Sequence, residues 1–125
     1  MAVKLVTLAF NSGRQAAMVD FYRALGANLQ RKQISKGGES FFGILGNLEI
    51  EIYSIAKKAS LASPDFSMRF QVLDIAATIQ KVKQLPDFEI IMDIEMLPDG
   101  KKAIVVDPDG HSVELIQYWS ATGSD

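Results

Sequence analysis

The chain has 125 residues, of which 48% are hydrophobic and 22% are charged; its net charge is −2 and its pI is about 5.4. Such a length and composition fit one compact soluble domain with a packed core. Because a strongly basic face is absent, we expect neither nucleic acid nor an anionic membrane surface as a partner. The lack of cysteine excludes disulfides, thiolate metal sites and a cysteine nucleophile.

The apolar start of the chain, residues 1–10, is too short and wrongly flanked for a signal peptide. No run approaches the roughly 20 apolar residues that a membrane span needs. We therefore expect a cytoplasmic protein.

The first half of the sequence predicts a strand, a helix and three more strands. Val3–Phe10 is apolar and partly β-branched, which is typical of a strand. Arg14–Leu25 has apolar residues at helical spacing, with Asn11 or Ser12 as a capping acceptor before it and Gly26 as a stop after it. Turn sequences at 36–38 and 46–47 then separate strands expected at 28–35, 39–45 and 48–54.

The same order restarts after a linker at residues 56–65. A strand is expected at 66–72, then a helix at 75–85, which Asp74 caps and Pro86 follows. Two turn sequences, 98–100 and 108–110, separate the strands expected at 89–95, 101–107 and 112–118.

The two halves also repeat individual residues. Phe10 and Phe70 lie 60 positions apart, as do Leu25 and Leu85, which end the two helices. An internal repeat of this kind predicts stacked equivalent units. We therefore expect an α+β fold in a single domain, built from two tandem βαβββ modules at 1–55 and 66–120. The alternative is an ordinary α+β sandwich with coincidental symmetry.

Three motifs resemble the vicinal oxygen chelate superfamily of glyoxalases, bleomycin-resistance proteins and extradiol dioxygenases. Residues 21–26, FYRALG, are similar to the end of that superfamily's first helix, although one residue shorter. Residues 70–75, FQVLDI, are similar to the start of its second module. Residues 107–115, DPDGHSVEL, resemble its C-terminal motif. The matches occur in the superfamily's order and span nearly the whole chain.

The resemblance implies a glyoxalase-like fold in which a curved mixed sheet of paired modules surrounds a cavity. Active members hold a divalent metal there with a histidine on the first strand and a glutamate on the last strand of each module. The metal polarises or chelates adjacent substrate oxygens. By this resemblance, the chemistry would be that of a lyase such as lactoylglutathione lyase, or of a dioxygenase.

This sequence departs from that pattern at both histidine positions, which fall on or beside Thr7 and on Ser67. The glutamate positions match better, with Glu114 in the second module and either Glu49 or Glu51 in the first. Hydroxyl groups are poor ligands for the transition metals that this superfamily uses. The expected cofactor is therefore none, or at most a weakly bound divalent cation on Glu49, Glu51 and Glu114.

Strand alternation places Ser67, Arg69 and Gln71 on one face of their strand. Carboxylates in a partly buried site need a compensating cation, and Arg69 is the candidate. It would pair with Glu114 and with Glu49 or Glu51, or it would hold an anionic ligand. The alternative is that Arg69 is solvated on an open sheet surface.

Other polar and aromatic residues carry weaker indications. His111, the only histidine, is interpreted as a turn residue of DPDGH rather than as a ligand or base. Lys32, Lys101 and Lys102 flank turns and are expected to be solvated. Phe41 and Tyr53 would line a pocket if both pointed inward.

Three functions remain open at this point. The first interpretation is a small-molecule-binding protein with a degenerate metal site, whose ligand contacts would come from Thr7, Ser67, Arg69, Gln71 and Tyr53. The alternative is a metal-dependent lyase of the lactoylglutathione lyase type, with Glu114 as its catalytic residue. A scaffold acting through a protein partner is the third. A homodimer is expected because short members of the superfamily usually build their sites across a two-fold interface, with Tyr118 and Trp119 as contact candidates.

Overall fold

The computed structural model describes residues 3–33, 39–55 and 66–119. The chain divides into two compact units, Met1–Leu61 and Ala62–Asp125. The division falls within the linker expected at 56–65. That linker and the turn expected at 36–38 lie outside the described residues.

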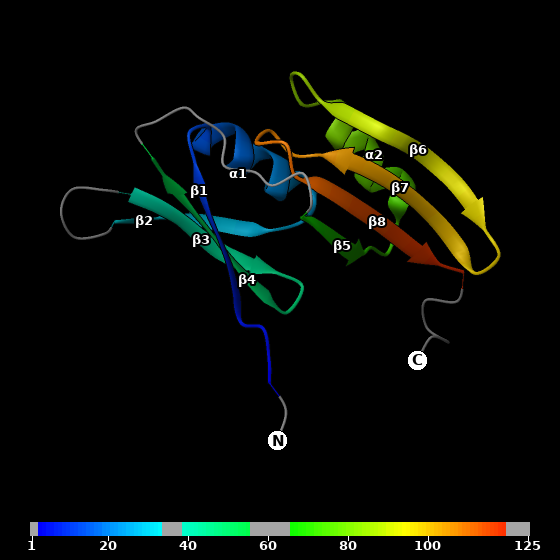
Figure 1. Cartoon of the computed structure of the whole chain (residues 1–125), viewed down its shortest axis with the longest axis horizontal. Helices are drawn as coiled ribbons and strands as arrows, with labels where there is room; N and C mark the ends of the chain where they lie inside the picture. Colours follow the sequence, from blue (N-terminus) through cyan, green and yellow to red (C-terminus); the bar gives the residue numbers. More distant parts are fainter. Residues whose placement is uncertain (1–2, 34–38, 56–65, 120–125) are drawn as a thin grey trace. The chain divides into compact units, whose positions relative to one another are not determined.

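The first unit contains one helix and one four-stranded mixed sheet (Figure 1). Its elements are β1 (Thr7–Ser12), α1 (Gln15–Ala24), β2 (Asn28–Gln33), β3 (Glu39–Leu45) and β4 (Leu48–Ser54). The strand order is β1-β4-β3-β2. Strand β1 runs parallel to β4, whereas β3 is antiparallel to both of its neighbours.

The second unit repeats this plan element for element. Its elements are β5 (Ser67–Gln71), α2 (Ile75–Lys83), β6 (Glu89–Leu97), β7 (Gly100–Val106) and β8 (Ser112–Tyr118). The strand order β5-β8-β7-β6, with β5 parallel to β8, matches that of the first sheet. The expected α+β fold with two βαβββ modules is therefore confirmed.

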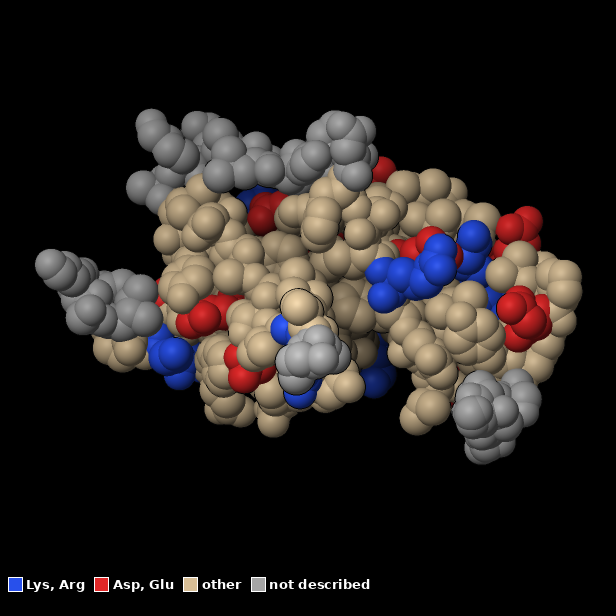
Figure 2. Space-filling model, turned by 60° about the horizontal axis from the view of Figure 1, so that its bottom comes forward, with Lys and Arg blue, Asp and Glu red and all other residues tan. Residues whose placement is uncertain are grey.

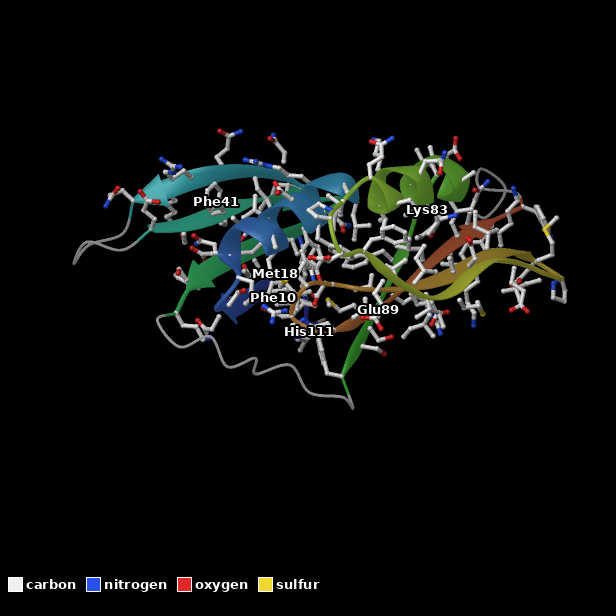
Figure 3. All side chains as sticks on the ribbon, turned by 90° about the horizontal axis from the view of Figure 1, so that it is seen from above. Phe10, Met18, Phe41, Lys83, Glu89 and His111 are labelled. Atoms are coloured by element: carbon white, nitrogen blue, oxygen red, sulfur yellow. The ribbon has the colours of Figure 1, made fainter. Side chains whose placement is uncertain are left out.

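Each unit has its own core between the helix and one face of the sheet. In the first unit, Phe10 of β1 and Met18 of α1 are both buried there (Figure 3). The ring of Phe10 stacks on that of Tyr22 with centroids 5.3 Å apart. In the second unit, the side chains of Ile79 and Leu115 are buried. Full burial of one such side chain contributes about 1.5–3 kcal/mol, so these apolar faces fix the side of the sheet that each helix covers.

The first strand begins and ends later than the sequence indicated. It starts at Thr7 rather than Val3, and it includes Asn11 and Ser12, which were expected to follow the strand and to offer a capping acceptor for the helix. Asn11 and Ser12 pair with Tyr53 and Ser54 of β4, so the ladder of the parallel pair extends the strand past its apolar run.

Local hydrogen bonds accompany the helix ends, but the expected side-chain cap of α1 by Asn11 or Ser12 is not formed, because its N-cap residue is Arg14. The Ser12 hydroxyl accepts the Arg14 backbone N–H at 2.9 Å, just before α1. Gly26, with φ of +113°, follows the helix end and donates its N–H to the Arg23 carbonyl. The expected cap of α2 is confirmed, since the Asp74 side chain accepts the Ala77 N–H at 3.1 Å. In the described part of the chain, no helix has the length and apolarity to cross a membrane.

Candidate functional site

The polar residues of interest lie on the side of each sheet that faces away from its helix. We call this side the glutamate face, because it carries Glu51 in the first sheet and Glu114 in the second. Along β4, Ile50 and Ile52 are buried on the helix side, whereas Glu49, Glu51 and Tyr53 alternate with them. Along β8, Glu114 lies between the buried Val113 and Leu115. Strand alternation thus separates core and glutamate face in both units.

Strand register identifies Glu51, rather than Glu49, as the counterpart of Glu114. Phe10 of β1 is paired with Ile52, and Phe70 of β5 is paired with Leu115. Glu51 and Glu114 each precede these partners by one residue. The sequence left Glu49 and Glu51 as alternatives. The ladder partners of Phe10 and Phe70 decide between these two glutamates in favour of Glu51.

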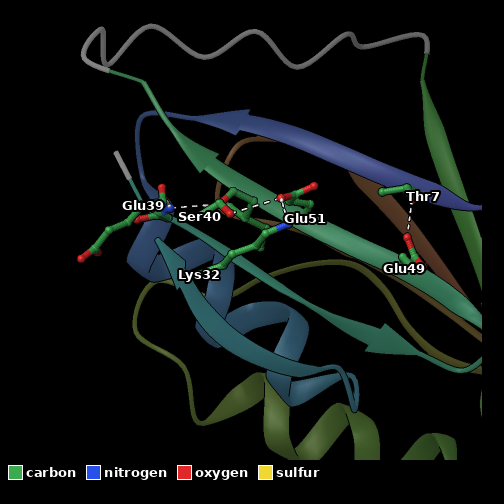
Figure 4. Close-up of polar contacts among 8 residues, drawn as sticks. Thr7, Lys32, Glu39, Ser40, Glu49 and Glu51 are labelled. Carbon is green, nitrogen blue, oxygen red and sulfur yellow. Dashed lines mark hydrogen bonds and ion pairs between the residues drawn. The ribbon is translucent and has the colours of Figure 1, made fainter. Parts of the chain in front are cut away.

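In the first sheet, Glu51 collects contacts from three strands (Figure 4). Its Oε2 accepts the Ser40 hydroxyl of β3 at 3.2 Å and lies 3.8 Å from the Lys32 ammonium of β2. Its carboxylate also accepts the Tyr53 hydroxyl, and this hydrogen bond is the main reason that the pKa of Tyr53 is raised above its ordinary value. Desolvation and the negative charge of Glu51 raise that pKa further.

Thr7 and Glu49 form a separate contact on the same sheet. The Thr7 hydroxyl donates to Glu49 Oε1 at 2.6 Å, and the two residues are direct partners in the β1–β4 ladder (Figure 4). The residue at the first expected histidine position therefore donates a hydrogen bond to one of the candidate carboxylates.

In the second sheet, Glu114 is held between two cations. Its Oε2 lies 3.2 Å from Arg69 Nε and 3.5 Å from Lys102 Nζ. Arg69 is its direct partner on β5, whereas Lys102 comes from β7 on the other side. The predicted pair of Arg69 with Glu114 is therefore present. The Arg69 side chain is 65% exposed, against 19% for that of Glu114, which lies on a strand with neighbours on both sides.

The other two predicted residues of β5 share the face of Arg69. Ser67 pairs with Ser112 and Gln71 pairs with Ile116, and both are exposed. They lie two ladder positions on either side of the Arg69–Glu114 pair, which is the spacing of neighbours on one face of a strand. Ser67 thus supplies a hydroxyl on the face of Glu114 where the superfamily pattern has an imidazole.

His111 takes part in a tight turn between β7 and β8. One oxygen of the buried Asp107 accepts the backbone N–H groups of Asp109 and His111, at 3.0 and 2.9 Å. Its other oxygen lies 2.8 Å from His111 Nδ1. This geometry agrees with the interpretation of His111 as a turn residue.

Two lysines that flank turns lie beside glutamates. The Lys32 side chain is 55% exposed, as expected, although its Nζ lies 3.8 Å from Glu51 Oε2. The Lys102 side chain is 28% exposed, and its Nζ lies 3.5 Å from Glu114 Oε2. Lys101 Nζ lies 5.9 Å from the centre of the Trp119 ring. These contacts could not be read from turn-flanking positions, because they depend on which strand lies beside which.

The condition under which Phe41 and Tyr53 would line one pocket is not met, because the two side chains lie on opposite faces of the sheet. Phe41 pairs with Ile52, whose side chain is buried on the helix side, and the Arg23 guanidinium of α1 lies 5.8 Å from its ring centre. Tyr53 lies on the opposite side with Glu51. The aromatic residue of β3 on the glutamate face is Phe42, the ladder partner of Glu51.

The glutamate faces carry few of the donor groups that a transition metal prefers. Within the described ranges, no group of three or more histidine, aspartate or glutamate side chains is arranged to hold a metal ion. The two equivalent carboxylates already have positively charged neighbours. The expected histidine positions carry Thr7 and Ser67, whose hydroxyls are poor ligands for such metals.

Charge on these surfaces is paired locally. On the face drawn in Figure 2, lysine and arginine side chains lie in small groups beside aspartate and glutamate side chains, and neither sign forms an extended area. The ion pairs of Glu51 and Glu114 are likewise formed within their own sheets.

Comparison with known proteins shows which solved structures share this fold. No family model and no curated protein matches the sequence. The structure is similar to a glyoxylase/bleomycin resistance protein/dioxygenase domain from Frankia sp., with a TM-score of 0.73, 12% identity and coverage of 94% of this chain and 99% of that one. It is also similar to an antibiotic-binding protein from Streptomyces sp., with a TM-score of 0.64, 19% identity and coverage of 94% and 98%.

A third similar structure is a lactoylglutathione lyase from Agrobacterium tumefaciens, with a TM-score of 0.59, 17% identity and coverage of 93% and 94%. The chain therefore has the fold of these glyoxalase and bleomycin-resistance proteins, which is the fold that its motifs implied. At these identities the likeness concerns the fold alone.

Proposed function

We propose that the chain is a small-molecule-binding protein that acts without a catalytic metal. The observation that carries this proposal is the position of Glu114 between Arg69 and Lys102. A carboxylate that serves as a metal ligand must offer a lone pair to the ion. Here two cations lie against the same oxygen, and a divalent ion would have to displace them against charge repulsion.

Two further features support binding without a metal. Thr7 donates a hydrogen bond to Glu49, which stabilises that carboxylate without a cation. The face around Glu114 presents a guanidinium, a hydroxyl and an amide from Arg69, Ser67 and Gln71. Such a set is suited to hold polar groups of a ligand in a fixed orientation. The similar antibiotic-binding protein is an example of this fold in a binding protein.

The test is a measurement of metal content on untagged protein, followed by thermal-shift titrations with nickel, zinc, manganese and magnesium. We expect substoichiometric metal and no large stabilisation by any of these ions. A variant in which Arg69 and Lys102 are both replaced by methionine frees the carboxylate, and should gain a response to a divalent ion. Near-stoichiometric metal in the unmodified chain would overturn the proposal.

A metal-dependent lyase is the second candidate, and one observation favours it. Glu51 and Glu114 occupy equivalent ladder positions in the two sheets, which is where the superfamily pattern puts its two glutamates. The same titration decides between the candidates, since a lyase of this type needs a firmly held ion to stabilise negative charge on its substrate.

A further inference from the structure

Among the ion-paired side chains described in the first sheet, that of Glu51 is the least exposed to water. Its side chain is 12% exposed. The Ser40 hydroxyl donates to Glu51 Oε2 at 3.2 Å, and the Tyr53 hydroxyl is a second hydrogen-bond partner of the carboxylate. A carboxylate in such a place retains a strong preference for a cation beside it, because little water is left to solvate it.

The cation beside Glu51 is held loosely. Lys32 Nζ lies 3.8 Å from Oε2, which is beyond hydrogen-bond length, and the lysine side chain is 55% exposed. Lys32 belongs to β2, which forms the edge of the sheet two strands away from β4. Its flexible side chain must therefore extend over β3 to approach the carboxylate, at a cost in side-chain entropy.

An aromatic ring completes the surroundings of this ammonium group. Lys32 Nζ lies 5.1 Å from the centre of the Phe42 ring, within the range of a cation–π interaction. Phe42 is the ladder partner of Glu51 on β3, and the partner of Glu51 on β1 is Ala9. The carboxylate thus has an aromatic side chain on one side and only a methyl group on the other. A fixed carboxylate next to an aromatic face is the combination that recognises an ammonium group.

We propose that Glu51 and Phe42 form a binding site for the ammonium group of a small-molecule ligand, and that the Lys32 side chain occupies this site when no ligand is bound. The proposal rests on the proposed function, since it names the chemical class of the ligand. Binding exchanges one ammonium group for another, so no carboxylate is left unpaired at any stage. Lys32 acts as an internal competitor that weakens the binding of simple amines.

The test uses isothermal titration calorimetry with tetramethylammonium chloride and butylammonium chloride, with sodium chloride adjusted to keep the ionic strength constant. In Lys32→Met, the competing charge is absent and the apolar stem is kept. We expect this variant to bind both probes about tenfold more tightly than the unmodified chain. Lys83→Met is the matched control, because Lys83 is also ion-paired to a carboxylate, that of Asp93, at 3.1 Å.

Two variants remove the recognition groups, each with its own control. Glu51→Gln should abolish binding of both probes, whereas Glu39→Gln, which removes an exposed carboxylate of the same sheet, should not. Phe42→Leu should weaken binding severalfold. Phe41→Leu should leave it unchanged, because Phe41 lies on the helix side of the sheet. The phenylalanine pair keeps the test decisive if Glu51→Gln does not fold.

The proposal is overturned if Lys32→Met binds the probes no more tightly than Lys83→Met, or if Phe42→Leu and Phe41→Leu behave alike. Its failure is distinguishable from failure of the proposed function. Absence of ammonium binding in a chain that also holds no metal removes only this site. Stoichiometric metal removes the metal-free function whatever the ammonium probes show.

Discussion

The two sheets place a glutamate at the same ladder position but surround it with different partners. In the first sheet, β1 contributes only Ala9 beside Glu51, and the positive charge comes from Lys32 on the far edge strand. In the second sheet, β5 contributes Arg69 beside Glu114, and Lys102 lies on the neighbouring strand. The backbone plan is repeated, whereas the neutralising cation changes from a distant, exposed lysine to an adjacent arginine.

This difference shows which part of the repeat is fixed by packing. The buried residues on the helix side are apolar in both units except for Ser12, so the ladder positions are retained. The glutamate faces are free of that requirement, so their side chains can differ while the carboxylate position remains. One sheet thus offers an exchangeable charge partner and the other a closely held one.

The largest loss of stability should come from a substitution at Gly43, where the two sheets carry side chains of different size. Gly43 pairs with Leu29 and Ile50, and the corresponding residue of the second sheet, between Ile90 and Val113, is the buried Val105. A Cβ on Gly43 would lie 1.7 Å from the Asn28 carbonyl oxygen, so the backbone would have to move. We expect Gly43→Ala to lower the free energy of unfolding by about 3 kcal/mol, measured by urea denaturation.

Gly46→Ala is the control for Gly43→Ala. Gly46 has φ of +65°, and no atom lies within 4 Å of the place that an alanine Cβ would take, so only backbone strain of about 1 kcal/mol is expected. If the two substitutions lowered the free energy of unfolding equally, the close approach of the Asn28 carbonyl to Gly43 would not be what excludes a side chain there.

The connections between the last two strands also differ, and here the second unit depends on a buried acid. Two residues, Gly46 and Asn47, join β3 to β4, whereas the β7–β8 turn is organised by Asp107. Asp107→Ala leaves the N–H groups of Asp109 and His111 without their acceptor. We expect a loss of about 2–3 kcal/mol in thermal or urea unfolding. Asp99→Ala, in the turn after β6, should cost far less, and a comparable cost would contradict this account.

A smaller loss of stability is expected when either cation beside Glu114 is removed from the second sheet. Arg69→Met and Lys102→Met should each cost less than about 1 kcal/mol, because one cation remains and the arginine is largely exposed. The double variant leaves Glu114 without either partner, so its cost should exceed the sum by roughly 0.5–1 kcal/mol. Lys32→Met in the first sheet should cost less than either single change. Additive effects of Arg69→Met and Lys102→Met would mean that the two cations act independently on Glu114.

The smallest effect is spectroscopic and belongs to the first sheet. Hydrogen bonding to Glu51 raises the pKa of Tyr53, so its neutral phenol is favoured in the folded chain. The stabilisation is present below the ordinary tyrosine pKa and is lost as pH rises through the folded-state pKa. Absorbance difference titrations against Tyr53→Phe should show this late ionisation, and Glu51→Gln should shift it to lower pH. If the tyrosine titration were unchanged in Glu51→Gln, Glu51 would not be the cause of the raised pKa of Tyr53.

Much of the fold was predictable because its signals are local. Apolar alternation, the capping Asp74 and the glycine stop at Gly26 each act within a few residues, and the 60-residue repeat linked the two halves. The boundaries of β1 were less predictable. Asn11 and Ser12 are strand residues because β4 pairs with them, and this partner is distant in the sequence.

The site was predictable only in part for the same reason. Strand alternation placed Arg69 on the correct side of β5, and Glu114 is its ladder partner. The contacts of Lys32, Ser40 and Lys102 depend on strand order, which the sequence pattern did not provide. The choice between Glu49 and Glu51 likewise required the register of a parallel pair.

The place of the last strand of each module has a consequence for synthesis on the ribosome. In both sheets that strand lies between the first strand and the third, and Thr7 meets Glu49 across 42 positions of sequence. A nascent chain that ends before Leu48 can form the β2–β3 hairpin, but β1 has no strand to pair with until β4 emerges. Each sheet is therefore completed only when its final strand inserts between the first and the third. The sheet of the second unit is completed in the same way, after that of the first unit.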